Sequence, residues 1–98
     1  FDTEGNSSFA LPLILAQPDT ALLKKICAFL KKEQVEYRLG TAGGGNQARQ
    51  PYLKNYSFRQ ADDLDNANYI HDNSLYIGNH TELNKEQIVE LCRGLNNV

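Results

Sequence analysis

Two segments of this chain carry apolar residues at intervals of three and four, which is the spacing of one face of an α-helix. They cover residues 20–33 and 85–95. The apolar stripes consist of Leu22, Leu23, Ile26, Cys27 and Leu30 in the first segment and Ile88, Leu91, Cys92 and Leu95 in the second. A one-sided stripe is stable only when it is buried, so both helices require another layer to pack against.

Both segments begin at a recognisable capping signal. Asp19 or Thr20 can accept hydrogen bonds from the first free amides of the first helix, and Pro18 prevents the helix from extending backwards. Asn84 and Gln87 have the spacing of a capping box at the start of the second helix. We therefore expect both helices to begin at these residues.

Three short β-prone runs supply the other layer. Residues 9–16 are continuously apolar, which predicts a strand covered on both faces, and Pro12 predicts that it lies at a sheet edge because proline cannot donate to a ladder. Residues 35–39 alternate apolar and polar side chains, as in a half-buried strand, and residues 74–78 are also β-prone. We expect three strands.

The region between the second and third strands is less regular. Residues 51–60 are aromatic and basic, which predicts a turn or irregular segment, and residues 61–72 allow a short helix with Leu64, Ala67 and His71 along one side. The whole order is β-α-β-loop-(α)-β-α. This order predicts an α+β domain of two layers, with helices packed on one side of a small sheet.

The composition limits the functions that are open to the chain. It has 98 residues, enough for one domain spanning 1–98, and a formal charge of -2, which disfavours nucleic acid as a partner. No run of 18 apolar residues marks a membrane segment or a signal peptide, so we expect no membrane partner. The chain has no methionine, which leads us to expect a piece of a longer protein.

Cysteine and histidine do not form a recognisable metal or nucleophile motif. Cys27 and Cys92 belong to the apolar stripes, which favours buried, reduced thiols and a cytoplasmic setting, with a single disulfide between them as a minor alternative. Neither cysteine has ligand spacing to His71 or His80, so we expect no metal site. Nothing resembles a nucleophile elbow, and no catalytic residue is assigned.

The glycine-rich stretch at residues 41–52 is the main candidate for a ligand site. Three successive glycines let the backbone turn sharply or approach another group closely. The Walker pattern fails because no Lys-Ser or Lys-Thr pair follows the last glycine. Glycine amides, Asn46 and Arg49 could hold an anionic or hydroxyl-rich ligand, and an ordinary tight turn is the alternative.

The polar turn after the third strand is the second candidate. It follows Gly78 and begins with Asn79 and His80. At this strand exit, His80 is free to face a ligand or a partner chain. His71, in contrast, is expected to be a partly buried structural histidine.

Several motifs together resemble the C-terminal part of the DegT/DnrJ/StrS family. In chain order they are Arg38, Ala42-Gly-Gly-Gly-Asn46, Arg49-Gln-Pro51, Tyr76-Ile-Gly78-Asn79-His80, Leu83-Asn-Lys-Glu-Gln87-Ile and a terminal Leu95-Asn96. Members of this family are pyridoxal-phosphate-dependent sugar aminotransferases and deoxysugar 3-dehydratases that act on nucleotide-linked sugars. Three glycines stand before Asn46 where relatives commonly have one, which implies a differently shaped loop.

The resemblance implies the small C-terminal domain of an aspartate-aminotransferase-like enzyme. The residue that holds pyridoxal 5'-phosphate belongs to the large domain, so no cofactor is expected in this chain and the isolated chain should be inactive. The longer enzyme would be a cytoplasmic homodimer in lipopolysaccharide or other surface polysaccharide biosynthesis. By the same resemblance, Asn46, Arg49, Asn79 and His80 would bind the sugar nucleotide.

Two other classes of function fit the residues. A free-standing module could bind a small anionic ligand through the glycine loop without catalysis. Alternatively, Tyr52, Tyr56 and Phe58 could form an exposed aromatic patch for protein interaction.

Overall fold

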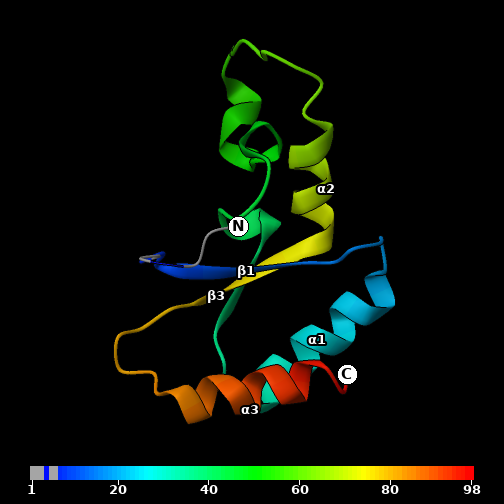
Figure 1. The fold of residues 1–98 in the computed structure, drawn as a ribbon. Helices are drawn as coiled ribbons and strands as arrows, with labels where there is room; N and C mark the ends of the chain where they lie inside the picture. Colours follow the sequence, from blue (N-terminus) through cyan, green and yellow to red (C-terminus); the bar gives the residue numbers. More distant parts are fainter. Residues whose placement is uncertain (1–3, 5–6) are drawn as a thin grey trace.

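The computed structural model describes residue 4 and residues 7–98, which form a small α+β fold. Its regular elements run β1, α1, β2, α2, β3 and α3 along the chain (Figure 1), with short 3₁₀ turns between β2 and α2. The predicted α+β class and the predicted order of elements are confirmed. No helix of the described residues has the length and apolarity needed to cross a bilayer.

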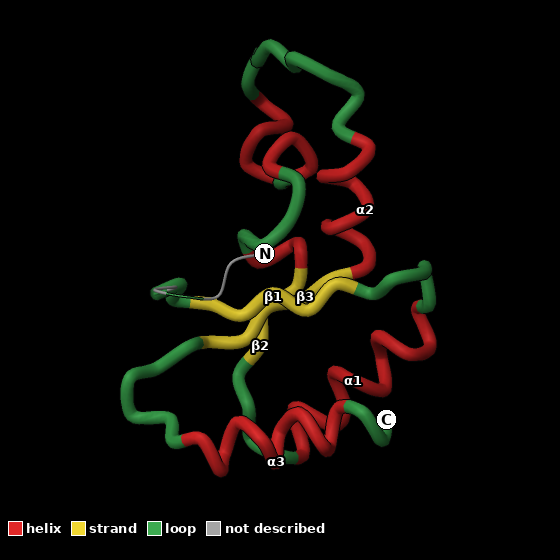
Figure 2. The backbone as a smooth tube through the Cα atoms, viewed as in Figure 1, coloured by secondary structure: helices red, strands yellow, loops and turns green. Residues whose placement is uncertain are grey.

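The strands within the described residues form one antiparallel sheet in the order β1-β3-β2 (Figure 2). β1 is Ala10–Ile14, β2 is Tyr37–Leu39 and β3 is Ser74–Gly78. Pro12 pairs with Tyr76 from an edge strand, as predicted from its missing amide hydrogen. β2 is shorter than the predicted strand because the amide of Val35 donates to the carbonyl of Leu30 at the end of the preceding helix.

The two predicted helices form with their predicted caps. α1 spans Thr20–Lys32, and the side chain of Asp19 accepts a hydrogen bond of 2.8 Å from the amide of Leu22. α3 spans Lys85–Leu95, where Asn84 and Gln87 make both bonds of the capping box. The cap residues therefore determined where each helix begins.

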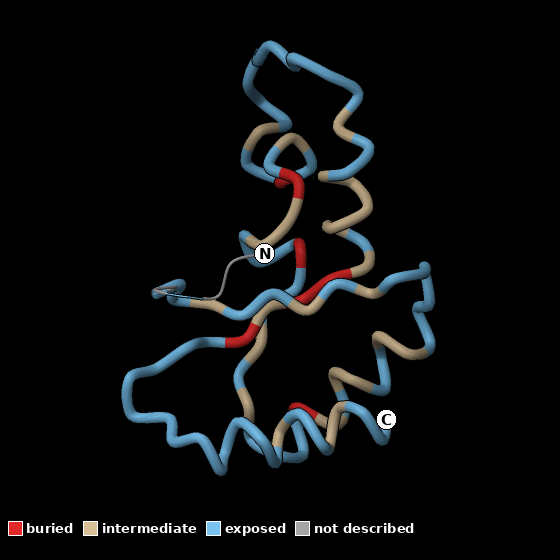
Figure 3. The backbone as a smooth tube through the Cα atoms, in the orientation of Figure 1, coloured by how far each residue is buried: buried red, intermediate tan, exposed pale blue. Residues whose placement is uncertain are grey.

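The core lies between the sheet and these two helices, which sit on the same side of it (Figure 1). Among the large apolar side chains of the described residues, those of Leu30, Leu75 and Ile77 are buried. Leu91 and Leu95 of α3 pack against them. Only a few short stretches of the backbone are coloured as buried in Figure 3. The core is accordingly small for a chain of this length.

Two predictions about burial are wrong. β1 is not covered on both faces, since Leu11 is 48% and Ile14 is 52% exposed. Cys92 is exposed rather than buried, because α3 turns only part of its stripe toward the core, while Cys27 is half-buried. Both thiols are free.

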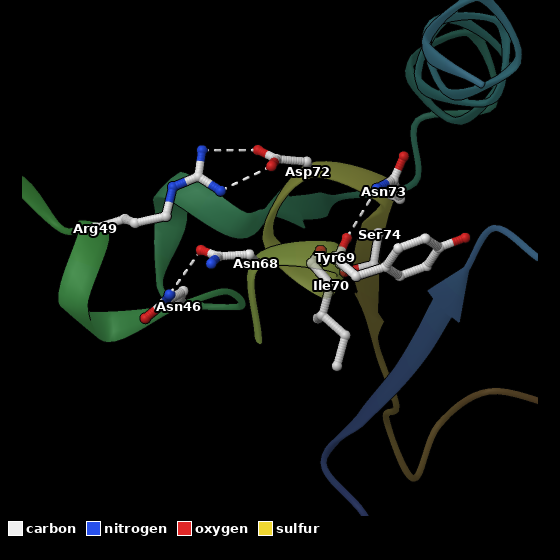
Figure 4. A network of polar contacts seen from close by, with 8 residues as sticks. All are labelled: Asn46, Arg49, Asn68, Tyr69, Ile70, Asp72, Asn73 and Ser74. Atoms are coloured by element: carbon white, nitrogen blue, oxygen red, sulfur yellow. Dashed lines mark hydrogen bonds and ion pairs between the residues drawn. The ribbon is translucent and has the colours of Figure 1, made fainter. Parts of the chain in front are cut away.

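α2 spans Asp65–Asn73 and continues into β3 without a connecting loop. The helix begins later than predicted, after Leu64, whose φ of 64° is left-handed. At the junction, the hydroxyl of Ser74 donates to the carbonyl of Ile70 at 2.6 Å and Asn73 donates to that of Tyr69 at 3.0 Å (Figure 4). These bonds use carbonyls at the C-terminal end of the helix and join it firmly to the strand.

Candidate functional site

The glycine loop leaves β2 and packs closely against α2 and β3. A methyl group on Gly45 would lie 2.6 Å from Nδ1 of His71, and one on Gly44 would lie 2.8 Å from the ring of Tyr76. Gly40 is buried directly against the backbone of His71. Gly43 has a φ of 97°, where side chains are disfavoured. The glycines therefore permit a close approach between the loop, the helix and the central strand.

Asn46 is held inside this loop and is only 6% exposed. Its amide nitrogen donates to Oδ1 of Asn68 at 2.9 Å, and its oxygen accepts from the amide of Ala48 at 2.9 Å (Figure 4). The neighbouring Gln50 is also buried and donates to the carbonyl of Gly40 at 2.9 Å. Asn46 therefore fixes the shape of the loop, and its polar groups are largely used within the protein.

Arg49 lies beside α2 and forms a bidentate ion pair with Asp72 (Figure 4). Both nitrogen–oxygen distances are 2.8 Å. The hydrogen bonds lower the pKa of Asp72 and raise that of Arg49. The side chain of Arg49 remains 41% exposed, so its other N–H groups are accessible to a ligand.

Asn79 and His80 lie at the opposite end of β3 from α2. Asn79 donates from its side chain to the carbonyl of Ser8 at 2.8 Å, and His80 is exposed at the strand exit, as predicted. β3 has five residues and spans about 17 Å. The structure thus places the four predicted site residues in two pairs, one near each end of the central strand.

A groove of about 620 Å³ adjoins the His80 end of the sheet. The end of α1, β2 and the start of α3 form its walls, and His80 is one of its lining residues. Its charged lining comprises Glu33, Glu36, Arg38 and Glu90. Sequence reasoning missed this groove, because it is assembled from the ends of elements that are far apart in the chain.

Tyr37 also lines the groove and interacts with Cys27 of α1. A hydrogen bond with the Cys27 side chain and partial burial raise the pKa of the Tyr37 phenol.

A second hollow of about 460 Å³ lies between the glycine loop and the segment before α2. Asn46, Phe58 and Arg59 are among its lining residues. Arg59 is exposed and adds a positive charge beside the loop. No sequence motif identified Arg59 as a site residue, because it lies 13 positions from Asn46 and only the fold brings the two residues together.

His71 occupies an unusual position at the centre of the loop contact. Its Nδ1 atom is buried and has no hydrogen-bond partner among the described residues. The ring is half-buried against Gly45, which agrees with the structural role predicted for it. Nowhere in residue 4 or residues 7–98 do three metal-binding side chains gather.

Comparison of the chain with protein-family models, curated proteins and solved structures finds no match.

Proposed function

We propose that this chain is the small domain of a pyridoxal-phosphate-dependent enzyme of the DegT/DnrJ/StrS type, a nucleotide-sugar aminotransferase or 3-dehydratase. The motifs around Asn46, Arg49 and His80 support this proposal. In the longer enzyme, the domain binds the nucleotide-linked sugar and helps to close the active site. The enzyme works in the cytoplasm in surface polysaccharide biosynthesis and is a homodimer.

Exposed apolar side chains on and beside the edge strand β1 are the observation that carries this proposal. The glycine loop covers Tyr76 of the central strand, so the exposed surface lies along β1. α1 and α3 both cover the same face, to which Leu75 and Ile77 point. On β1, Ile14 alternates with Leu13 and is 52% exposed, and Phe9 just before the strand is 81% exposed. Exposed apolar surface of this kind is typical of a face that packs against another domain. In the longer enzyme, the large cofactor-binding domain packs against this exposed apolar surface.

The cofactor and this domain have separate tasks in the proposed enzyme. Pyridoxal phosphate, bound by the large domain, supplies the electron sink for chemistry at the sugar. Arg49 uses two of its N–H groups on Asp72 and keeps the remaining donors for a phosphate oxygen. Because the ion pair already orients the guanidinium, little side-chain freedom is lost on binding. Asn46 keeps the loop in shape beside it.

Kinetics of the full-length enzyme test the role of Arg49. Arg49→Ala should raise KM for the nucleotide sugar about 10-fold or more, the effect of losing a hydrogen bond to a charged group. Asp72→Asn is the matched control, since it weakens the internal ion pair but keeps the guanidinium, and it should change KM far less. Equal effects of the two variants would show that the pair acts only by holding the loop.

The native gene product tests the enzyme class itself. A protein several-fold heavier than this chain, with the visible absorption of bound pyridoxal phosphate, is expected. Failure of a heavier product to bind added pyridoxal phosphate would refute the proposal.

The groove of about 620 Å³ favours a second candidate, a non-catalytic module that binds a small ligand. Saturable binding of a nucleotide sugar to the 98 residues alone would favour this candidate, because half of an enzyme site should bind only weakly. A protein-interaction module is also consistent with the exposure of Tyr52, Tyr56 and Phe58, at 58%, 69% and 50%. Its partner binding would be insensitive to nucleotide sugars.

A further inference from the structure

The two edge strands of the sheet differ in their ability to pair with another strand. β1 carries Pro12, which has no amide hydrogen to donate. β2 forms the other edge, contains no proline and pairs only with β3 within the described residues. The outward backbone groups of Tyr37–Leu39 therefore have no partner strand among the described residues, while the amide of Val35 just before the strand is bonded to the carbonyl of Leu30.

The charged side chains of this edge strand are accessible. Glu36 and Arg38 are both exposed. Residues 35–38 line the groove of about 620 Å³ together with residues 76–78 of the central strand, so the groove lies across the end of the sheet. Leu83, in the turn before α3, and Ile88 of α3 also line it and are 39% and 43% exposed.

The side chains along this edge are self-complementary. Residues 35–39 read Val-Glu-Tyr-Arg-Leu, so the order apolar, charged, aromatic, charged, apolar is the same in both directions, with the charges reversed. Glu36 and Arg38 lie on the same side of the strand, where they form an exposed ion pair. Two antiparallel copies centred on Tyr37 place Glu36 of each opposite Arg38 of the other.

We propose that β2 is a self-association edge, which pairs antiparallel with β2 of a second copy about a two-fold axis at Tyr37. The contact joins two three-stranded sheets into one of six strands. Glu36 and Arg38 then exchange partners across the axis, and the exposed Leu39 lies beside each of these charge pairs. This inference does not depend on the proposed function, because it uses only the edge of this chain.

Charge exchange at residues 36 and 38 tests the pairing by sedimentation velocity over a range of concentrations. The wild-type 98-residue chain should show a reversible monomer–dimer equilibrium. Arg38→Glu and Glu36→Arg each replace two opposite-charge contacts with two like-charge contacts and should weaken the dimer at least about 10-fold. The double variant that carries both changes restores opposite charges and should recover the dimer.

A matched control separates this effect from a general change of charge. Lys24→Glu makes the same reversal on an exposed residue of α1 and should leave dimerisation unchanged. Hydrogen exchange of the peptide covering residues 35–39 should slow as the protein concentration rises, which reports pairing of this strand directly. The proposal is overturned by a wild-type chain that stays monomeric at millimolar concentration, by single variants that dimerise as the wild type does, or by a double variant that fails to recover.

Discussion

Gly40→Ala tests whether the glycines around the loop are required by close packing. Gly40 is buried where β2 ends, directly against the backbone of α2. An added methyl group would lie 2.8 Å from Cα and 2.9 Å from the carbonyl carbon of His71, and closer still to its oxygen. Ordinary contacts of a Cβ atom are 3.4–4 Å. The helix would have to move away by at least about half an ångström.

The destabilisation by Gly40→Ala depends on how rigid the atoms that clash with the new methyl group are. Overpacking of a tight site typically costs about 1–3 kcal/mol, and the upper part of that range applies because backbone cannot rotate aside. Alanine also restricts the unfolded chain more than glycine does, which offsets about 0.4–1 kcal/mol of this destabilisation. We therefore expect a net loss of about 2 kcal/mol in the free energy of unfolding. The free energy of unfolding of a domain of this size is roughly 5–15 kcal/mol in total, so the loss is substantial.

Urea denaturation followed by far-ultraviolet circular dichroism measures this loss. With a slope of about 1–3 kcal/mol per molar urea, the midpoint should fall by roughly 1–2 M. Gly43→Ala is the comparison, because nothing lies within 4 Å of that position and only its φ of 97° is unfavourable. It should cost less, about 1 kcal/mol. A Gly40→Ala midpoint equal to that of the wild type, or above that of Gly43→Ala, would refute the packing argument.

Three further predictions concern the core, a helix cap and the ion pair. Leu30→Ala should lower the free energy of unfolding by about 2–5 kcal/mol in urea titrations, because the side chain is fully buried, whereas exposed Val89→Ala should change it by less than about 0.5 kcal/mol. Asn84→Ala removes the cap of α3 and should cost about 1 kcal/mol in thermal or urea unfolding. The stabilisation from Asp72 should be present above about pH 4 and fall away as pH drops through its lowered pKa, so wild type and Asp72→Asn should converge in stability toward pH 2. A difference between these two that persists unchanged at acid pH would contradict the pairing with Arg49.

Local signals were sufficient to predict most elements of the fold. The caps at Asp19 and Asn84 and the run at residues 74–78 act over a few residues, and the corresponding elements form where expected. Burial was predicted less well. The apolar run at residues 9–16 predicted a strand covered on both faces, but Leu11 and Ile14 of β1 are 48% and 52% exposed.

The candidate site shows the same division between local and long-range information. The glycine run marked a place of close approach, but its partners His71 and Tyr76 are about 30 residues away in sequence. Arg49 was recognisable as an anion ligand, whereas its pairing with Asp72 depends on how α2 docks beside the loop. The groove beside β2 is lined by residues of α1, β2, β3 and α3, which are far apart in the chain, so no sequence pattern indicated it.

The direct join between α2 and β3 has a mechanical consequence. Residues 65–78 form one continuous segment of helix and strand. At its middle, the side chains of Asn73 and Ser74 hydrogen-bond to carbonyls of the last turns of the helix. The glycine loop is tied to one half through Asn68 and Asp72, and the turn with His80 follows the other end. No loop separates the two halves. We therefore expect a displacement of the glycine loop to be coupled to the turn at the far end of β3.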